Sequence, residues 1–321
     1  MLLNVHNLSI TIPSKRGSLE AVRGISFLLE AGKSLGIVGE SGCGKSLTSM
    51  ALMGLLPKNF QVHADSLTFE GQELLSLNEK QWQNIRGKKM SMIFQDPMSS
   101  LNPSLTIGSQ LREVYLAHTQ LPKEEIEKSM IELLAKVGIT EPQRRLKSYP
   151  HQLSGGMCQR IMIAMAIANG PQLLLADEPT TALDVTIQAQ IMGLIKKLQR
   201  SEKLSLIFVG HNLALVAQCV DELMVMYAGE IVEKGPVREV LENPKHPYTV
   251  GLLKSLPRPE EVARQHQLYS IPGTVPPLYD RPQGCQFGPR CPQRQDKCGQ
   301  NPPMLQGESH HFACYYPQGV A

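Results

Sequence analysis

The sequence contains few aromatic residues and no hydrophobic run long enough to cross a membrane. Aromatic residues make up 5% of the 321 residues, with a single tryptophan, so no aromatic surface for stacking nucleic-acid bases is expected. The longest apolar run, residues 161–168, is far shorter than the roughly 20 residues of a transmembrane helix. The N-terminus also lacks the basic segment and apolar core of a signal peptide. We therefore expect a cytosolic protein.

The charge and the composition do not identify a binding partner, but they bear on the domain number and on the role of the cysteines. The 32 basic and 29 acidic residues give a formal net charge of +3 without a long like-charge block, so charge alone identifies no partner. The length predicts one large core with a smaller appendage. Seven cysteines are present, an odd number, and four of them lie near the C-terminus. This pattern is less typical of a secreted disulfide framework than of a ligand cluster in a reducing compartment.

Residues 39–46 match the phosphate-binding pattern G-x-x-x-x-G-K-[ST]. A buried strand is predicted over 35–38 and a helix over 47–56, which is the context that the motif requires. The loop glycines let backbone N–H groups point at phosphate oxygens, and the N-terminus of the following helix attracts the same anion. Lys45 is expected to reach the terminal phosphates and Ser46 to bind Mg²⁺. The predicted nucleotide-binding residues of this segment are Gly39, Glu40, Ser41, Gly42, Cys43, Gly44, Lys45, Ser46 and Leu47.

Cys43 lies among these inward-pointing N–H groups and near Lys45. That environment favours the thiolate, so we expect enhanced reactivity toward alkylating reagents and protection by ATP. The alternative is a small, buried side chain that fills space.

The remaining pattern predicts an α/β fold. Alternating apolar and polar residues predict antiparallel strands before the phosphate loop, and helical periodicity predicts a helical insertion after Gln95. The alternation of strands and helices from 35 to 209 indicates a doubly wound core closed by a hairpin around 228–229. The individual predictions are strands at 2–12, 24–29, 66–71, 90–94, 173–178 and 204–209, and helices at 107–118, 123–137 and 161–168.

The apolar strand over 173–178 ends in two carboxylates, Asp177 and Glu178. Buried strands seldom end this way, and open parallel sheets bind ligands at the carboxyl ends of their strands. Asp177 is therefore predicted to hold Mg²⁺ through water and Glu178 to activate the attacking water, the alternative being two solvated loop acids. His211 follows the next strand, where the phosphates are expected.

A second glycine-rich helix start, Ser154-Gly155-Gly156, has two interpretations. Ser154 can be a simple N-cap, or the helix start can bind an anion that belongs to another molecule.

Together these motifs resemble those of the nucleotide-binding subunits of ABC transporters. The matching segments are 39–46, Gln95, 153–156, 174–178, 181–184 and His211. The resemblance covers residues 1 to about 255 and implies a P-loop NTPase core of the ABC ATPase type. That core has an antiparallel β edge and a helical insertion at about 96–160, and residues 256–321 are expected to form a small C-terminal domain with four cysteines.

The resemblance also implies roles for the residues of the acidic strand and its surroundings. Asp177 supports Mg²⁺, Glu178 is the catalytic base, and His211 contacts the γ-phosphate. Gln95 binds the metal and couples the ATPase to the membrane subunit. Leu19 stands where an aromatic residue that stacks on adenine is common.

Other residues are implied to act on the opposite subunit of an ATP-sandwiching dimer. Ser154, Gly155 and Gly156 would contact the γ-phosphate held by that subunit, and Asp184 would cross the interface. Hydrolysis would then be linked to closing and reopening of the dimer.

The C-terminal segment resembles the first ATPase subunit of bacterial dipeptide and oligopeptide importers, on residues 243–249 and the surroundings of Cys285 and Cys291. This resemblance implies a second, paralogous ATPase, two transmembrane permease subunits and an extracytoplasmic peptide-binding protein. The chain would lie peripherally on the cytoplasmic face of the inner membrane. Relatives in the same family import nickel or antimicrobial peptides.

ABC ATPases that act on nucleic acid or the ribosome are a less favoured alternative. The DNA-repair type carries long coiled-coil or zinc insertions and the ribosomal type carries two phosphate loops, whereas this sequence has neither and shows no basic stripe. A further alternative makes the tail an independent redox module.

Cys285, Cys291, Cys298 and Cys314 are separated by five, six and fifteen residues. Structural zinc usually has at least one tight C-x₂₋₄-C pair, so the spacing disfavours zinc. Iron–sulfur clusters also take four cysteines, and the importer resemblance implies a [4Fe-4S] cluster in this tail. Zinc, and free or disulfide-bonded cysteines, are the alternatives.

Overall fold

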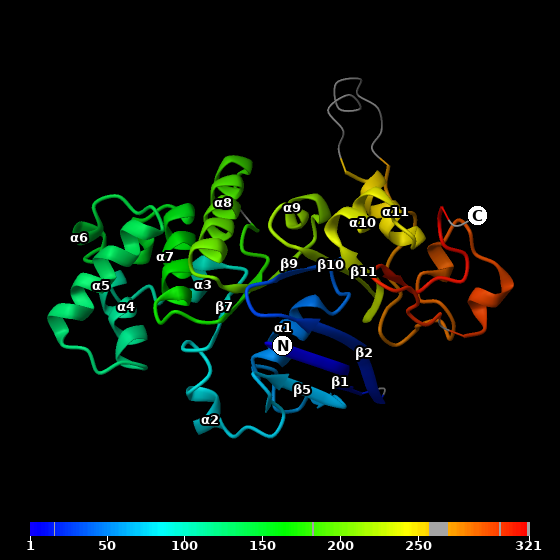
Figure 1. Ribbon diagram of the computed structural model, residues 1–321, viewed down its shortest axis with the longest axis horizontal. Coiled ribbons are helices and arrows are strands. Elements are labelled where there is room, and N and C mark those ends of the chain that lie inside the picture. The colour runs from blue at the N-terminus through cyan, green and yellow to red at the C-terminus, as the bar shows by residue number, and fades with distance from the viewer. Residues whose placement is uncertain (16, 182, 257–268, 302, 320–321) are drawn as a thin grey trace. The chain divides into compact units, whose positions relative to one another are not determined.

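The computed structural model describes residues 1–15, 17–181, 183–256, 269–301 and 303–319 (Figure 1). The chain divides into two compact units. The first consists of Met1–Leu29, Ser34–Leu75 and Phe208–Ala321, and the second of Glu30–Lys33 and Ser76–Ile207. Part of the predicted C-terminal domain, at 257–268, 302 and 320–321, lies outside the described residues, as does Ala182 of the 181–184 motif.

The first unit begins with the antiparallel sheet that the alternating sequence predicts. Its strands run in the order β2-β1-β5-β6, and β4 also pairs with β1. On β1, Leu3, Val5, Leu8 and Ile10 are at most 1% exposed, because one face of the strand packs into the core; the alternation shifts between Val5 and Leu8, where the pairing with β2 is irregular. The strands are β1 (Leu3–Ser14), β2 (Gly17–Leu29), β4 (Gln61–His63), β5 (Ser66–Phe69) and β6 (Gln72–Glu73).

A second group of strands in the first unit places the phosphate loop. The strand β3 (Ser34–Val38) is buried along its whole length and pairs in parallel with β10 (Glu222–Tyr227). The predicted hairpin joins β10 to β11 (Glu230–Pro236), and its turn residues Ala228 and Gly229 have φ angles of 47° and 89°. Two successive positive φ angles are the geometry of the type I′ turns that fit the twist of a hairpin. The edge strand β12 (His311–Phe312) pairs with β11.

The helices of the first unit within the described residues are α1 (Lys45–Leu52), α9 (Leu213–Ala217), α10 (Val237–Glu242) and α11 (Pro247–Lys254). The segment from 269 onward is mostly irregular, with two short 3₁₀ turns at Gly288–Arg290 and Asp296–Gly299. It is fixed to β11 by the pairing of β12 and by His310, whose Nε2 lies 2.7 Å from Oε1 of the fully buried Glu233. A turn-rich segment of this kind needs such anchors because it buries little apolar surface of its own.

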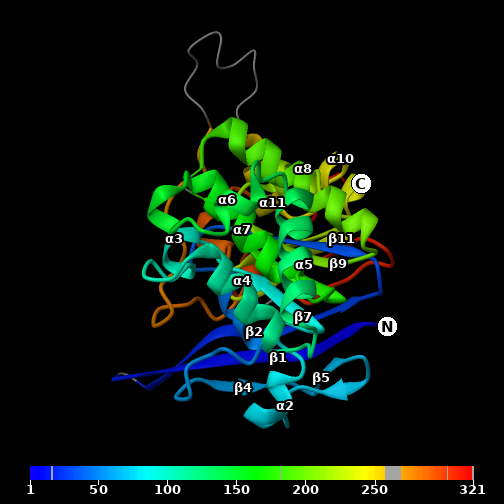
Figure 2. The same cartoon turned by 90° about the vertical axis from the view of Figure 1, so that its left-hand side faces the viewer.

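The second unit contains the parallel strands β7 (Met90–Ile93) and β8 (Leu173–Asp177), both fully buried. The helices α4, α5 and α7 lie together in Figure 2. The predicted apolar face of α5 is confirmed, since Ile126, Met130, Leu133, Leu134 and Val137 are all buried. The helices are α2 (Glu79–Gln83), α3 (Pro97–Ser100), α4 (Ile107–Leu116), α5 (Lys123–Lys136), α6 (Pro142–Arg145), α7 (Gly155–Ile167) and α8 (Val185–Ser201). The strand β9 (Ser205–Gly210) has its first three residues in the second unit and its last three in the first.

Two helices begin earlier than predicted. The helix α7 begins at Gly155 rather than at 161, and α1 begins at Lys45 rather than at 47 and ends at Leu52 rather than at 56. Glycine has low helix propensity, but it is tolerated in the first turn, where a capped N-terminus decides the start. None of the helices that the structure describes has the length and hydrophobicity needed to span a bilayer.

Candidate nucleotide-binding site

The phosphate loop lies in the first unit between β3 and α1. At Gly39 a Cβ atom would lie 2.2 Å from the backbone oxygen of Met226, so no side chain fits there. Gly44 forms the N-cap of α1 with a φ of 104°, a conformation that L residues rarely adopt. The local backbone therefore requires glycine at the first and last of the loop's glycine positions.

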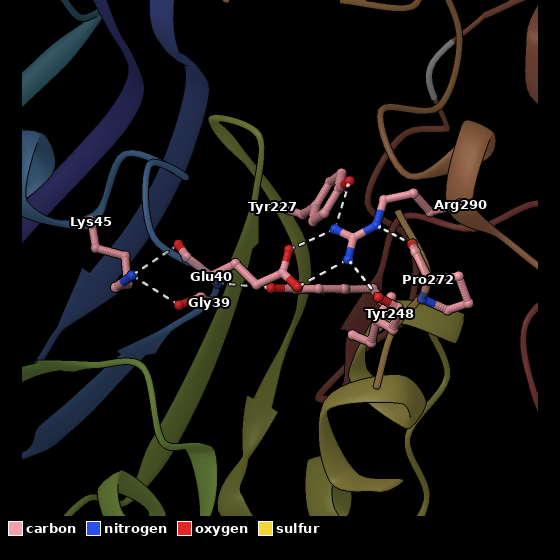
Figure 3. A network of polar contacts seen from close by, with 8 residues as sticks. Gly39, Glu40, Lys45, Tyr227, Tyr248, Pro272 and Arg290 are labelled. Atoms are coloured by element: carbon pink, nitrogen blue, oxygen red, sulfur yellow. Dashed lines mark hydrogen bonds and ion pairs between the residues drawn. The ribbon is translucent and has the colours of Figure 1, made fainter. Parts of the chain in front are cut away.

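The side chain of Lys45 turns back into this loop. It is 4% exposed, and its Nζ donates hydrogen bonds to the carbonyl oxygens of Gly39 at 2.8 Å and Glu40 at 3.0 Å (Figure 3). The ammonium group is thus held inside the loop at the start of α1, where an anionic phosphate is attracted by both the lysine and the helix N-terminus. Ser46 is the next residue of the helix.

The expected reactivity of Cys43 is wrong. The side chain is fully buried, and burial raises the pKa of its thiol, although the charge of Lys45 opposes this. A thiolate needs solvation or a dominant neighbouring cation, and here the loss of solvation outweighs the lysine. Cys43 is a buried, neutral side chain that fills the loop.

Glu40 is held by three partners. Its backbone N–H donates to the hydroxyl oxygen of Tyr248 at 2.8 Å, and its backbone oxygen accepts from Lys45. Its carboxylate forms a two-pronged ion pair with Arg290, with N···O distances of 2.6 and 3.1 Å (Figure 3). Sequence reasoning missed this contact, because Arg290 is 250 residues away and no motif links the two.

Arg290 itself is almost enclosed, with a side chain 5% exposed. Burial works to lower the pKa of its guanidinium, but hydrogen bonds to Glu40 and Tyr227 outweigh it and raise the pKa. The group is therefore permanently charged, and its partner Glu40 is needed to compensate that charge.

His211 and Leu19, two further residues singled out from the sequence, also lie in the first unit. His211 is exposed and follows β9, as predicted, and the next residue, Asn212, caps α9 by accepting from the N–H of Leu215. Leu19 lies on β2 opposite Ile12.

In the second unit, the structure brings Gln95 and Glu178 together. The amide nitrogen Nε2 of Gln95 donates to Oε2 of Glu178 at 3.2 Å, and the hydroxyl of Thr181 donates to the same oxygen at 3.0 Å. Glu178 has a φ of 46°, an uncommon conformation for glutamate that is typical of functional turns. Asp177, one residue earlier, ends β8 and is 5% exposed. The arrangement holds one partly buried carboxylate in a fixed orientation at a strand end.

The second glycine-rich helix start is capped. The hydroxyl of Ser154 accepts from the backbone N–H of Met157 at 3.3 Å, with Gly155 and Gly156 in the first turn of α7. Asp184 likewise caps α8 by accepting from the N–H of Ile187 at 2.9 Å. Capping is therefore the local role of both side chains.

The four C-terminal cysteines line a single cavity in the first unit, together with His246 and Phe287. Burial raises the pKa of the Cys285 and Cys314 thiols to about 11 and also raises that of Cys291. In the described part of the chain, no three His, Cys, Asp or Glu side chains are arranged to hold a metal ion. The four thiols thus share a cavity and supply sulfur atoms, which are ligands of iron and zinc. They are not arranged as a coordination shell around a metal ion.

The sequence was compared with protein families and with characterised proteins. Residues 22–181 match the ABC transporter family, and residues 232–298 match the oligopeptide/dipeptide transporter C-terminal region. The chain is 48% identical to the dipeptide transport ATP-binding protein DppD of Escherichia coli, over 98% of this chain and 97% of that protein. It is 48% identical to the oligopeptide transport ATP-binding protein OppD of Bacillus subtilis, over 97% and 87% of the two chains.

Solved structures agree with this match. The dimeric ATP-binding cassette MJ0796, in a post-hydrolysis state bound to ADP and Pi, is 27% identical and superposes with a TM-score of 0.64, covering 74% of this chain and 99% of that one. The expected α/β fold of the ABC ATPase type is confirmed. The chain belongs to the family of ATP-binding subunits of dipeptide and oligopeptide ABC transporters.

Proposed function

We propose that this chain binds and hydrolyses ATP to power the uptake of dipeptides or oligopeptides. The observation that carries the proposal is the similarity to peptide-transport ATP-binding proteins over nearly the whole chain, including the C-terminal region beyond the ATPase motifs. Nickel or antimicrobial peptides remain the alternative cargo. The predicted domain boundary at 255/256 also remains a proposal, since the matched C-terminal region begins at 232.

ATP binding would use the residues of the first unit. Lys45 would contact the β- and γ-phosphates, Ser46 would bind Mg²⁺, and His211 would contact the γ-phosphate. The closed loop around Lys45 supports this role, because its backbone carbonyls already hold the ammonium group in place.

Hydrolysis would use the residues of the second unit. Asp177 would support Mg²⁺ and Gln95 would contact it, while Glu178 would take the proton of the attacking water. The hydrogen bonds that Gln95 and Thr181 donate to Oε2 support this assignment, because they fix the orientation of the Glu178 carboxylate at the end of β8. The signature residues Ser154, Gly155 and Gly156, and Asp184, would act on the ATP of the opposite subunit.

The transporter would contain a second, paralogous ATPase, two transmembrane permeases and an extracytoplasmic peptide-binding protein. The chain would lie on the cytoplasmic face of the inner membrane as a peripheral subunit. We expect a complex of these subunits, reconstituted in vesicles, to take up a labelled dipeptide only when Mg-ATP is supplied on the side of this chain. Uptake of nickel in place of peptide, or stimulation of the ATPase by nucleic acid without any transport, would contradict the proposal.

The four cysteines would hold a [4Fe-4S] cluster, with zinc as the alternative. Their donor chemistry fits the group, and the cluster would serve as a structural staple for a segment with little core of its own. Protein purified without oxygen is expected to contain iron and acid-labile sulfide at about four atoms each per chain, and Cys291→Ser should lower both. Stoichiometric zinc without iron, or four free thiols without metal, would reject the cluster.

A further inference from the structure

Glu40 connects the phosphate loop to the C-terminal segment. It is the second residue of the loop, and its backbone oxygen accepts from the same Lys45 ammonium group that is expected to contact phosphate. Its carboxylate faces away from that lysine and toward Arg290 (Figure 3). Any movement of Arg290 therefore acts on the residue that helps to place the lysine.

Arg290 is held on its other side by the C-terminal segment. Its Nε donates to the carbonyl of Pro272 at 2.8 Å, one terminal nitrogen donates to the carbonyl of Ile271 at 3.3 Å, and the other reaches the Tyr227 hydroxyl at 3.2 Å. A guanidinium with this many partners has one orientation, because its planar fork cannot rotate without breaking several bonds.

Arg290 also adjoins the cysteine cavity directly. It is followed by Cys291, and the 3₁₀ turn that carries it begins at Gly288; both of these residues line the cavity. The N–H of Arg290 donates to the carbonyl of Phe287, another lining residue. A change in the position of Cys291 must therefore displace the backbone of Arg290.

A cluster of aromatic rings forms a second connection. The Phe287 ring packs against Tyr227 and Tyr248 with centroid distances of 5.2 and 5.4 Å, and Tyr248 is the residue whose hydroxyl accepts from the N–H of Glu40. The three rings are almost completely buried. Close packing of this kind transmits displacement, because a buried ring cannot shift without moving its neighbours.

From these contacts we infer that Arg290 is a positioning residue for the phosphate loop, through which the four-cysteine cavity controls the affinity for ATP. When Cys291 is fixed, Arg290 holds the Glu40 carboxylate and the loop keeps its ATP-binding shape. When the cavity is disrupted, Arg290 loses its orientation and the loop relaxes. The inference rests on the ATP-binding role proposed for the loop.

The first test is a double-mutant cycle in the full-length chain, measured as the Kd for Mg-ATP. Arg290→Gln and Glu40→Gln are each expected to weaken binding roughly tenfold, the scale of one charge-assisted hydrogen bond. The double variant should bind Mg-ATP no more weakly than the single variant with the higher Kd, since both changes remove the same ion pair. Arg290→Lys should restore part of the affinity. The matched control is Arg238→Gln, which removes an exposed Arg–Glu pair of 2.9 Å on α10 and should leave the Kd unchanged.

The second test asks whether the cavity acts through Arg290. Cys291→Ser should weaken Mg-ATP binding in the otherwise unchanged chain but have no additional effect in Arg290→Gln. Hydrogen exchange of the amides at 39–44 should accelerate in both variants, which a merely destabilised C-terminal segment would not produce. Glu40→Gln is nearly isosteric and partly exposed, so it tests the pair even if Arg290→Gln fails to fold.

Wild-type affinity in both Arg290→Gln and Glu40→Gln would overturn this inference and leave the proposed function standing. Equal effects of Cys291→Ser in the two backgrounds would show that the cavity does not act through Arg290. A wild-type chain that does not bind Mg-ATP at all would overturn the inference and the proposed function together.

Discussion

Replacing Glu178 with glutamine should abolish ATP turnover in the assembled transporter while ATP binding is retained. The amide is close in shape to the carboxylate and keeps an oxygen that can accept hydrogen bonds from Gln95 and Thr181, which lie 3.2 and 3.0 Å from Oε2. It cannot take a proton from water, however. General-base catalysis contributes about 10²–10⁴-fold to rate, so kcat should fall by at least that range.

The measurement is steady-state hydrolysis beside equilibrium binding of Mg-ATP to the same preparation. Glu202→Gln is a suitable control, because Glu202 lies in the same unit and pairs with Lys136 at 2.8 Å on a surface helix end. It should hydrolyse ATP normally. Hydrolysis by Glu178→Gln at close to the wild-type rate would remove Glu178 as the base.

Much of the fold could be predicted because burial imposes a period on the sequence. The strands β3, β7 and β8 are buried on both faces and appear as short apolar runs, and β1 alternates because only one of its faces is buried. Short elements could not be predicted in this way. Strands of two or three residues such as β4 and β6 contain too few positions for a period, and their pairing with distant strands determines them.

The candidate site was predictable where chemistry is concentrated in a local motif. The loop of Lys45 and the strand end of Glu178 each carry their own signal, whereas the hydrogen bond between Gln95 and Glu178 was not predicted and is seen only in the structure. The reactivity of Cys43 was mispredicted because neighbouring residues in sequence reveal charge but not solvation. The Glu40–Arg290 pair was missed for a related reason: its geometry depends on how the C-terminal segment folds back on β10 and α11, through Tyr227 and Tyr248.

Replacing Lys45 with alanine should have the opposite signature to Glu178→Gln, with ATP binding itself lost. The lysine is 4% exposed and donates to the carbonyl oxygens of Gly39 and Glu40, so its removal deletes a buried positive charge and the bonds that shape the loop. Charge-assisted bonds to phosphate are strong, and we expect the Kd for Mg-ATP to rise more than about 100-fold. Lys58→Ala, which changes an exposed lysine shortly after α1, is the matched control and should bind normally. Circular dichroism establishes that both variants are folded. If folded Lys45→Ala bound Mg-ATP like the control, the loop at 39–46 would not be the phosphate site, and the positioning role of Arg290 would be excluded with it.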